Sequence, residues 1–118
     1  MSEKTAAIRS YREFWPYYLN EHRRPGTRVL HLAGTGLATV LLAAGVVASS
    51  PWLLAVAVAA GYGPAWFAHI AVEKNRPATF RYPLWSLISD FRMAATWLAG
   101  GLHRELEHVG IGTPVTRR

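Results

Sequence analysis

The fold is decided by the stretch from Val29 to Val72, VLHLAGTGLATVLLAAGVVASSPWLLAVAVAAGYGPAWFAHIAV, which contains no Lys, Arg, Asp or Glu. A helix needs about 20 apolar residues to cross a bilayer core, and this stretch is long enough for two. Ser49, Ser50 and Pro51 interrupt it near its middle, as a tight polar turn would. The pattern predicts a transmembrane helical hairpin over residues 28–72, with spans at 29–48 and 52–72. The alternative is a pair of buried helices in a soluble bundle, although such helices usually keep a polar face.

The composition narrows the class of protein further. The chain has 118 residues, the length of one domain, and 51% of them are hydrophobic while 17% are charged, which excludes a disordered chain. It contains no cysteine, so disulfides, iron–sulfur clusters and thiolate zinc sites are excluded. The net charge is +6, but the basic residues flank the apolar stretch instead of forming a patch with stacking aromatics. We therefore expect no nucleic-acid partner.

The segments around the hairpin complete a small all-α integral membrane bundle, a single domain over residues 1–118. The sequence pattern predicts an amphipathic helix and a turn over residues 1–27, because apolar and aromatic side chains recur there every three or four positions. Residues 73–83 form a basic loop, residues 84–102 a third apolar helix, and residues 103–118 a polar tail. The third helix either spans the membrane or lies in its interface. If it spans, His103 and Glu107 emerge on the far side, as part of a solvated tail.

The distribution of basic residues predicts the orientation. Residues 1–28 carry six Lys or Arg and residues 73–83 carry three, whereas the turn at 49–51 carries none. Cytoplasmic loops are enriched in Lys and Arg. We therefore expect the N-terminus and both feet of the hairpin to face the cytoplasm.

Three histidines are predicted to lie at one depth. His31 and His69 both sit about 26 Å from the turn, counted at 1.5 Å per residue, so an antiparallel hairpin places them side by side. His22 ends the preceding amphipathic helix near the same surface. Glu73 follows His69 by four residues, which is the same face of an α-helix. The spacing therefore gathers three imidazoles and one carboxylate.

Such a set suits a first-row metal, since two or three histidines with one acid are the ligands of non-haem Fe(II) oxygenases. Zinc accepts the same ligands. Glu73 is expected either to bind the ion or to accept a hydrogen bond from His69. The alternative is that these are ordinary interfacial histidines and that Glu73 pairs with Lys74 or Arg76. Asp90, within the third segment, is either a functional intramembrane acid or the partner of a loop arginine.

Two blocks of sequence resemble a known family. They are FWPYYLNEHRRPGTRVLHLAGT, with Tyr18, His22 and His31, and GYGPAWFAHIAVEKNRPATFRYPLWSLISDFRM, with His69 and Glu73. Together they resemble the bacterial branch of the 2-hydroxy fatty acid dioxygenase family, which acts in the route from phytosphingosine to odd-numbered fatty acids. The resemblance implies that His22, His31 and His69 bind iron, and that the protein lies in a bacterial-type inner membrane.

The resemblance also implies an activity. We expect an Fe(II)-dependent dioxygenase that uses O₂ to shorten a 2-hydroxy fatty acid by one carbon, with its acyl chain between the helices. Two other functions stay open, a membrane electron-transfer protein with haem held by two histidines and a non-catalytic membrane scaffold. The residues expected to act in the reaction are the acids Glu73 and Asp90, with Arg23, Arg24, Arg28 or Lys74 holding the substrate carboxylate.

Overall fold

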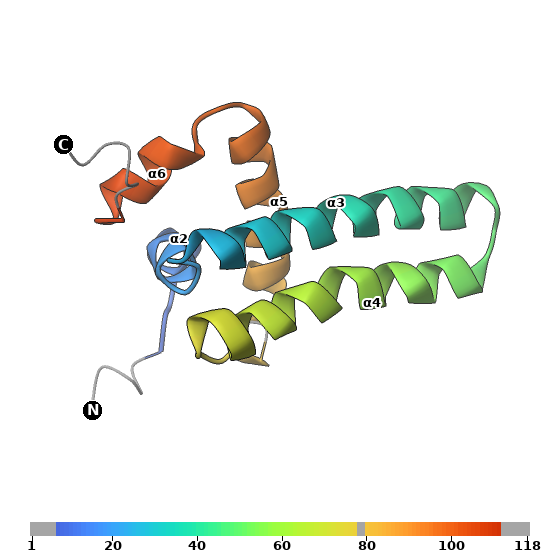
Figure 1. Ribbon diagram of the computed structural model, residues 1–118, viewed down its shortest axis with the longest axis horizontal. Coiled ribbons are helices and arrows are strands. Elements are labelled where there is room, and N and C mark those ends of the chain that lie inside the picture. Colours follow the sequence, from blue (N-terminus) through green and yellow to red (C-terminus); the bar gives the residue numbers. More distant parts are fainter. Residues whose placement is uncertain (1–6, 78–79, 112–118) are drawn as a thin grey trace.

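A computed structural model describes residues 7–77 and 80–111, and within these ranges the chain is all-α, as predicted. Two long antiparallel helices, α3 (Pro25–Val47) and α4 (Pro51–Phe67), form a hairpin. A short π-helix, η1 (Ala68–Glu73), continues α4. Three further helices, α2 (Tyr11–Asn20), α5 (Pro83–Leu98) and α6 (Leu102–His108), lie toward the open end of the hairpin (Figure 1).

Proline and serine set the ends of the hairpin helices. Pro25 and Pro51 each occupy the first turn of a helix, where the missing N–H costs no hydrogen bond. The Ser50 side chain caps α4 by accepting from the Leu53 backbone N–H at 3.2 Å. Helix α3 therefore starts at Pro25, a few residues before the start of the first span predicted at residue 29. The break near residues 49–51 is confirmed.

The two hairpin helices contact each other closely and leave most of their outer surface exposed. A Cβ at Gly34 would lie 3.1 Å from the backbone oxygen of Ala60, so the helices approach to within backbone contact there. On the outer surface, Val40, Val47 and Trp52 are 65%, 86% and 75% exposed. Two segments, Pro25–Val47 and Pro51–Glu73, are long and apolar enough to cross a membrane. An apolar surface of this extent is typical of interaction with lipid or another protein.

A second core lies beside the open end of the hairpin, between α2, α5 and α6. Phe14 and Tyr18 of α2 are at most 1% exposed, and Met93 of α5 and Leu106 of α6 pack into the same cluster. Trp15 Nε1 also donates a hydrogen bond to Glu105 Oε1 at 2.9 Å, which joins α2 to α6. This core attaches the segments on both sides of the hairpin to each other.

The C-terminal part differs from the prediction. Helix α5 has 16 residues, about 24 Å at 1.5 Å per residue, and it runs across the hairpin instead of along it (Figure 1). Gly100, at φ +83°, then reverses the chain, so that α6 returns to α2. The expectation of a solvated tail from residue 103 is therefore wrong for residues 103–111, which include the buried Leu106 and Ile111. Residues 112–118 of that tail, and 78–79 of the predicted basic loop, lie outside the described residues.

Candidate metal centre

The loop between α2 and α3 carries the first histidine. The His22 side chain is 1% exposed, and its ring stacks on Tyr18 with the ring centroids 4.1 Å apart. His22 Nδ1 lies 2.6 Å from the Tyr18 carbonyl oxygen. Because a carbonyl only accepts, Nδ1 carries the proton and Nε2 keeps its lone pair. Burial lowers the pKa of His22 well below its ordinary value, which favours the neutral imidazole.

The second histidine, His31, lies near the start of α3 and is 5% exposed. Its Nδ1 lies 3.3 Å from Oδ1 of Asp90, on α5. The same oxygen accepts a hydrogen bond from the Tyr18 hydroxyl at 2.5 Å. The carboxylate favours a proton on His31 Nδ1, which leaves the lone pair on Nε2.

The third histidine lies on η1, at the end of the second long helix. His69 is 2% exposed, and its Nδ1 lies 2.7 Å from Oδ1 of Asn75. Asn75 Nδ2 donates to the Glu21 carbonyl at 3.2 Å, which orients the amide with its oxygen toward His69. The Asn75 backbone N–H also donates to the His69 carbonyl at 2.9 Å, because Lys74 adopts the left-handed conformation with φ +64° and turns the chain back. Asn75 therefore holds His69 by two hydrogen bonds.

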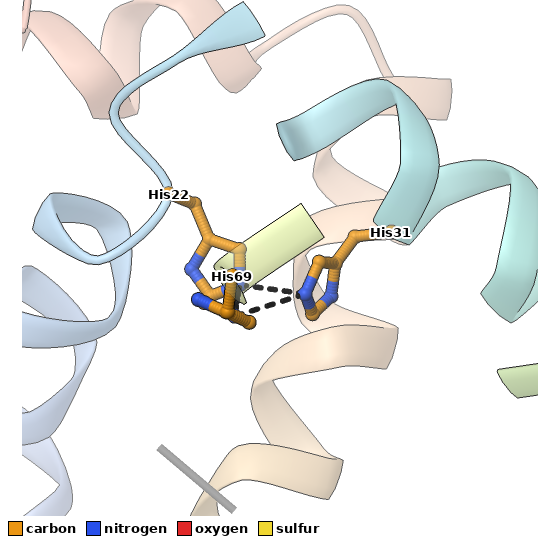
Figure 2. Close-up of side chains that lie close together, drawn as sticks. All are labelled: His22, His31 and His69. Atoms are coloured by element: carbon orange, nitrogen blue, oxygen red, sulfur yellow. Dashed lines mark hydrogen bonds between the residues drawn. The ribbon is translucent and has the colours of Figure 1, made fainter. Parts of the chain in front are cut away.

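The three Nε2 atoms converge on one point (Figure 2). Each pair of nitrogens, among His22, His31 and His69, is separated by 3.1 Å. Every such contact needs one N–H and one lone pair, and three nitrogens that each carry only one of these cannot satisfy three contacts at once. With the protons on Nδ1, three lone pairs face one another in a buried position. A cation would turn this mutual repulsion into attraction.

The spacing of the nitrogens fits a single metal ion. Zinc binds imidazole nitrogen at about 2.0–2.1 Å. When the N–metal–N angle lies between its octahedral and its tetrahedral value, two nitrogens bound to the same ion are therefore about 2.8–3.4 Å apart. The observed separation of 3.1 Å lies within this range. Imidazole suits iron, zinc, copper and nickel, so the donor set accommodates iron without selecting it. The three histidines lie close enough to bind one metal ion, as the depth estimate predicted.

Glu73 is not the acceptor for His69, which corrects one expectation. Its Oε2 accepts a hydrogen bond from the backbone N–H of Arg24, and Asn75 takes the position beside His69 Nδ1. Among the described residues, the group with ligand atoms within 4.8 Å of one another contains the three histidines alone. Glu73 therefore joins the loop before α3 to the end of η1.

The cations expected to bind substrate differ in their surroundings. Arg23, Arg24 and Lys74 are exposed at the open end of the hairpin. Arg28 is buried, and its Nη1 donates to the backbone carbonyls of His22 and Arg23 at 2.9 and 2.8 Å, so it supports the loop that carries the first histidine.

The tertiary structure adds residues to the surroundings of the histidines that the sequence did not predict there. Asn75 was not expected from the sequence, since a position six residues after His69 lies off the face of a continuous helix. Tyr18 belongs to one of the two blocks that carry the family resemblance and to the predicted amphipathic helix, but its hydrogen bond to Asp90 spans 72 positions and leaves no local signal. His103 and Glu107 are exposed on α6, outside the group of three histidines.

Comparison with known proteins identifies one matching family. The family model described as Mpo1-like, "2-hydroxy-palmitic acid dioxygenase Mpo1-like", matches residues 8–102 of the chain. The matched region contains the three histidines, Asn75 and both members of the Tyr18–Asp90 pair. No curated protein and no solved structure matches the chain.

Proposed function

The chain belongs to the Mpo1-like family, and from this premise we propose that it is an Fe(II)-dependent dioxygenase of 2-hydroxy fatty acids. In the proposed reaction, one 2-hydroxy fatty acid and one O₂ give the fatty acid shorter by one carbon, carbon dioxide and water. The hydroxyl-bearing carbon becomes the new carboxyl carbon, and the old carboxyl carbon leaves as carbon dioxide. Both atoms of O₂ are consumed.

One observation carries the proposal, the convergence of three buried imidazole lone pairs at 3.1 Å. His22, His31 and His69 would hold the iron, and their three nitrogens leave other coordination positions open for substrate and O₂. When bound, the iron supplies the site at which a hydroxy acid and O₂ can be brought together. The protein orients the imidazoles through their Nδ1 partners and shields them from water.

The surroundings of the site are compatible with a long-chain substrate. A groove of about 400 Å³ lies between α3 and α5. Its walls are mostly apolar, and Leu32, the neighbour of His31 in the chain, lines it. We place the acyl chain in this groove and the carboxylate beside one of the cations at the open end of the hairpin. The residues that line the groove are Leu32, Thr35, Gly36, Thr39, Phe91, Ala94, Ala95, Trp97 and Leu98.

The proposed location is a bacterial inner membrane, with the open end of the hairpin at the cytoplasmic surface. The two apolar helices and the basic residues at their feet support this orientation. It places the histidines at the membrane surface, where the polar head of a fatty acid lies while its chain remains in the lipid.

The haem alternative does not fit the distances. Axial ligands on opposite faces of one haem iron are separated by about 4 Å, twice a metal–nitrogen bond of about 2 Å. His31 and His69 Nε2 are only 3.1 Å apart, and His22 Nε2 lies at the same distance from both. The scaffold alternative predicts a protein that neither binds iron nor consumes substrate.

The test is to purify the full chain in detergent, load it with Fe(II), and measure bound iron together with consumption of O₂ and 2-hydroxypalmitate. We expect about one iron per chain, and pentadecanoate as the product. His31→Ala and His69→Ala should abolish both iron binding and turnover. If both variants bind iron and consume the substrate like the parent protein, the proposal is wrong.

A further inference from the structure

The three metal-facing histidines have chemically different partners. His22 Nδ1 faces a backbone carbonyl and His69 Nδ1 faces the neutral amide of Asn75. Among residues 7–77 and 80–111, a carboxylate faces the Nδ1 of His31 alone, that of Asp90 at 3.3 Å. A partner that carries full negative charge raises the electron density on the imidazole more than a neutral acceptor does. His31 is therefore distinguished from the other two ligands by its surroundings.

The Asp90 carboxylate also accepts a hydrogen bond from a buried tyrosine. The Tyr18 hydroxyl donates to the same oxygen that faces His31, at 2.5 Å, and Tyr18 is 1% exposed. This hydrogen bond withdraws negative charge from Oδ1. The two contacts on that oxygen therefore act in opposite directions on His31.

We propose that Asp90 and Tyr18 are a pair of positioning residues that sets the electron-donating strength of His31, and so the affinity and reduction potential of the bound metal. Asp90 increases the donation and Tyr18 limits it. The inference rests on the proposed function only in that His31 binds iron. It adds a control on the metal that the three histidines by themselves do not provide.

The Tyr18–Asp90 pair connects the helices that surround His31. Tyr18 lies on α2, Asp90 on α5 and His31 on α3, so the contacts join three helices. The Tyr18 ring also stacks on His22, with 4.1 Å between centroids. Replacement by phenylalanine keeps this ring and removes only the hydroxyl, and replacement of Asp90 by asparagine keeps its shape and removes only the charge.

Three variants of the full chain in detergent test the proposal, with Fe(II) as the probe. Asp90→Asn should weaken Fe(II) binding about 10–100-fold, the usual effect of losing a partner of a metal-bound histidine, and should raise the Fe(III)/Fe(II) potential because Fe(III) loses an electron-rich ligand. Tyr18→Phe should lower the potential without weakening Fe(II) binding. Asn75→Asp, which places a second carboxylate beside His69, should also lower it.

The readouts are Fe(II) affinity by competition with a chelator and potential by spectroelectrochemical titration. A contact that only holds the fold together would make Asp90→Asn and Tyr18→Phe shift the potential in one direction, or not at all, and either result overturns the inference. A parent protein that binds iron but consumes no hydroxy acid would overturn the proposed function while leaving this comparison valid. A parent protein that binds no iron would overturn both.

Discussion

Asn75→Ala should weaken metal binding, whereas Glu73→Gln should not. Asn75 accepts the hydrogen bond from His69 Nδ1 at 2.7 Å and holds the His69 carbonyl through its backbone. The substitution to alanine removes the side-chain acceptor only. Glu73 bonds to the Arg24 backbone instead, and glutamine retains an oxygen for that contact. The two residues are close in sequence, so they form a matched pair.

The magnitude follows from the linkage between binding and folding. At a free metal concentration 100 times the parent dissociation constant, binding stabilises the fold by about 2.7 kcal/mol. Losing the partner of a metal-bound histidine weakens affinity about 10–100-fold, so the same metal concentration is then only about 10 times, or equal to, the dissociation constant. The remaining stabilisation is about 1.4–0.4 kcal/mol. Asn75→Ala should therefore lose about 1.3–2.3 kcal/mol of metal-linked stability, and Glu73→Gln about none.

The assay compares each protein with and without metal. The free energy of unfolding is measured in detergent, first after treatment with a chelator and then at one fixed Fe(II) concentration, and the difference isolates the metal-linked part. The loss of the Asn75 side-chain hydrogen bonds, about 1 kcal/mol for each bond, lowers the stability of the metal-free protein too. It therefore cancels in the difference between the two measurements. Equal losses in the two variants, or a loss confined to Glu73→Gln, would refute the assignment of Asn75 as the partner of His69.

Three further predictions concern the hairpin and the C-terminal helix. Gly34→Ala should destabilise the protein by about 1–3 kcal/mol, seen as a lower unfolding midpoint, because a Cβ there lies 3.1 Å from a backbone oxygen of α4. A Cβ at Gly36 meets no atom within 4 Å, so Gly36→Ala should be tolerated. A cysteine at Ala48 should react with a membrane-impermeant thiol reagent in intact cells, and one at Glu107 should not, because α6 packs against α2 at the open end of the hairpin; the reverse labelling would contradict the proposed orientation. His103→Ala should bind iron as the parent does, since His103 is exposed and outside the three-histidine group; loss of iron, measured by metal analysis, would make it a ligand candidate.

The sequence by itself determined the hairpin and the meeting of two histidines. An uncharged stretch of this length, interrupted once by a polar turn, has room for two spans. The rise of a helix is constant, so equal distances from the turn place His31 and His69 at one depth. The observed 3.1 Å between their Nε2 atoms agrees with that estimate.

The third segment and the tail required the tertiary structure. An apolar helix such as 84–102 has the same sequence pattern whether it crosses a membrane or packs on a neighbour. The positions of α5 and α6 depend on residues far away in the sequence. The aromatic face of α2 packs against Met93 and Leu106, and its Trp15 donates a hydrogen bond to Glu105. Contacts between positions 90 apart in the sequence leave no local signal.

The partners of the histidines also depended on tertiary structure. Glu73 was expected beside His69 because residues four apart share one face of an α-helix. In the structure Glu73 is the last residue of the short π-helix η1, and its Oε2 accepts a hydrogen bond from the Arg24 backbone N–H. The left-handed Lys74 then turns the chain, so that Asn75 lies against His69 instead. The converging histidines could be located from the constant rise of a helix, whereas the groups that orient them depend on the left-handed turn at Lys74 and on packing between α2 and α5.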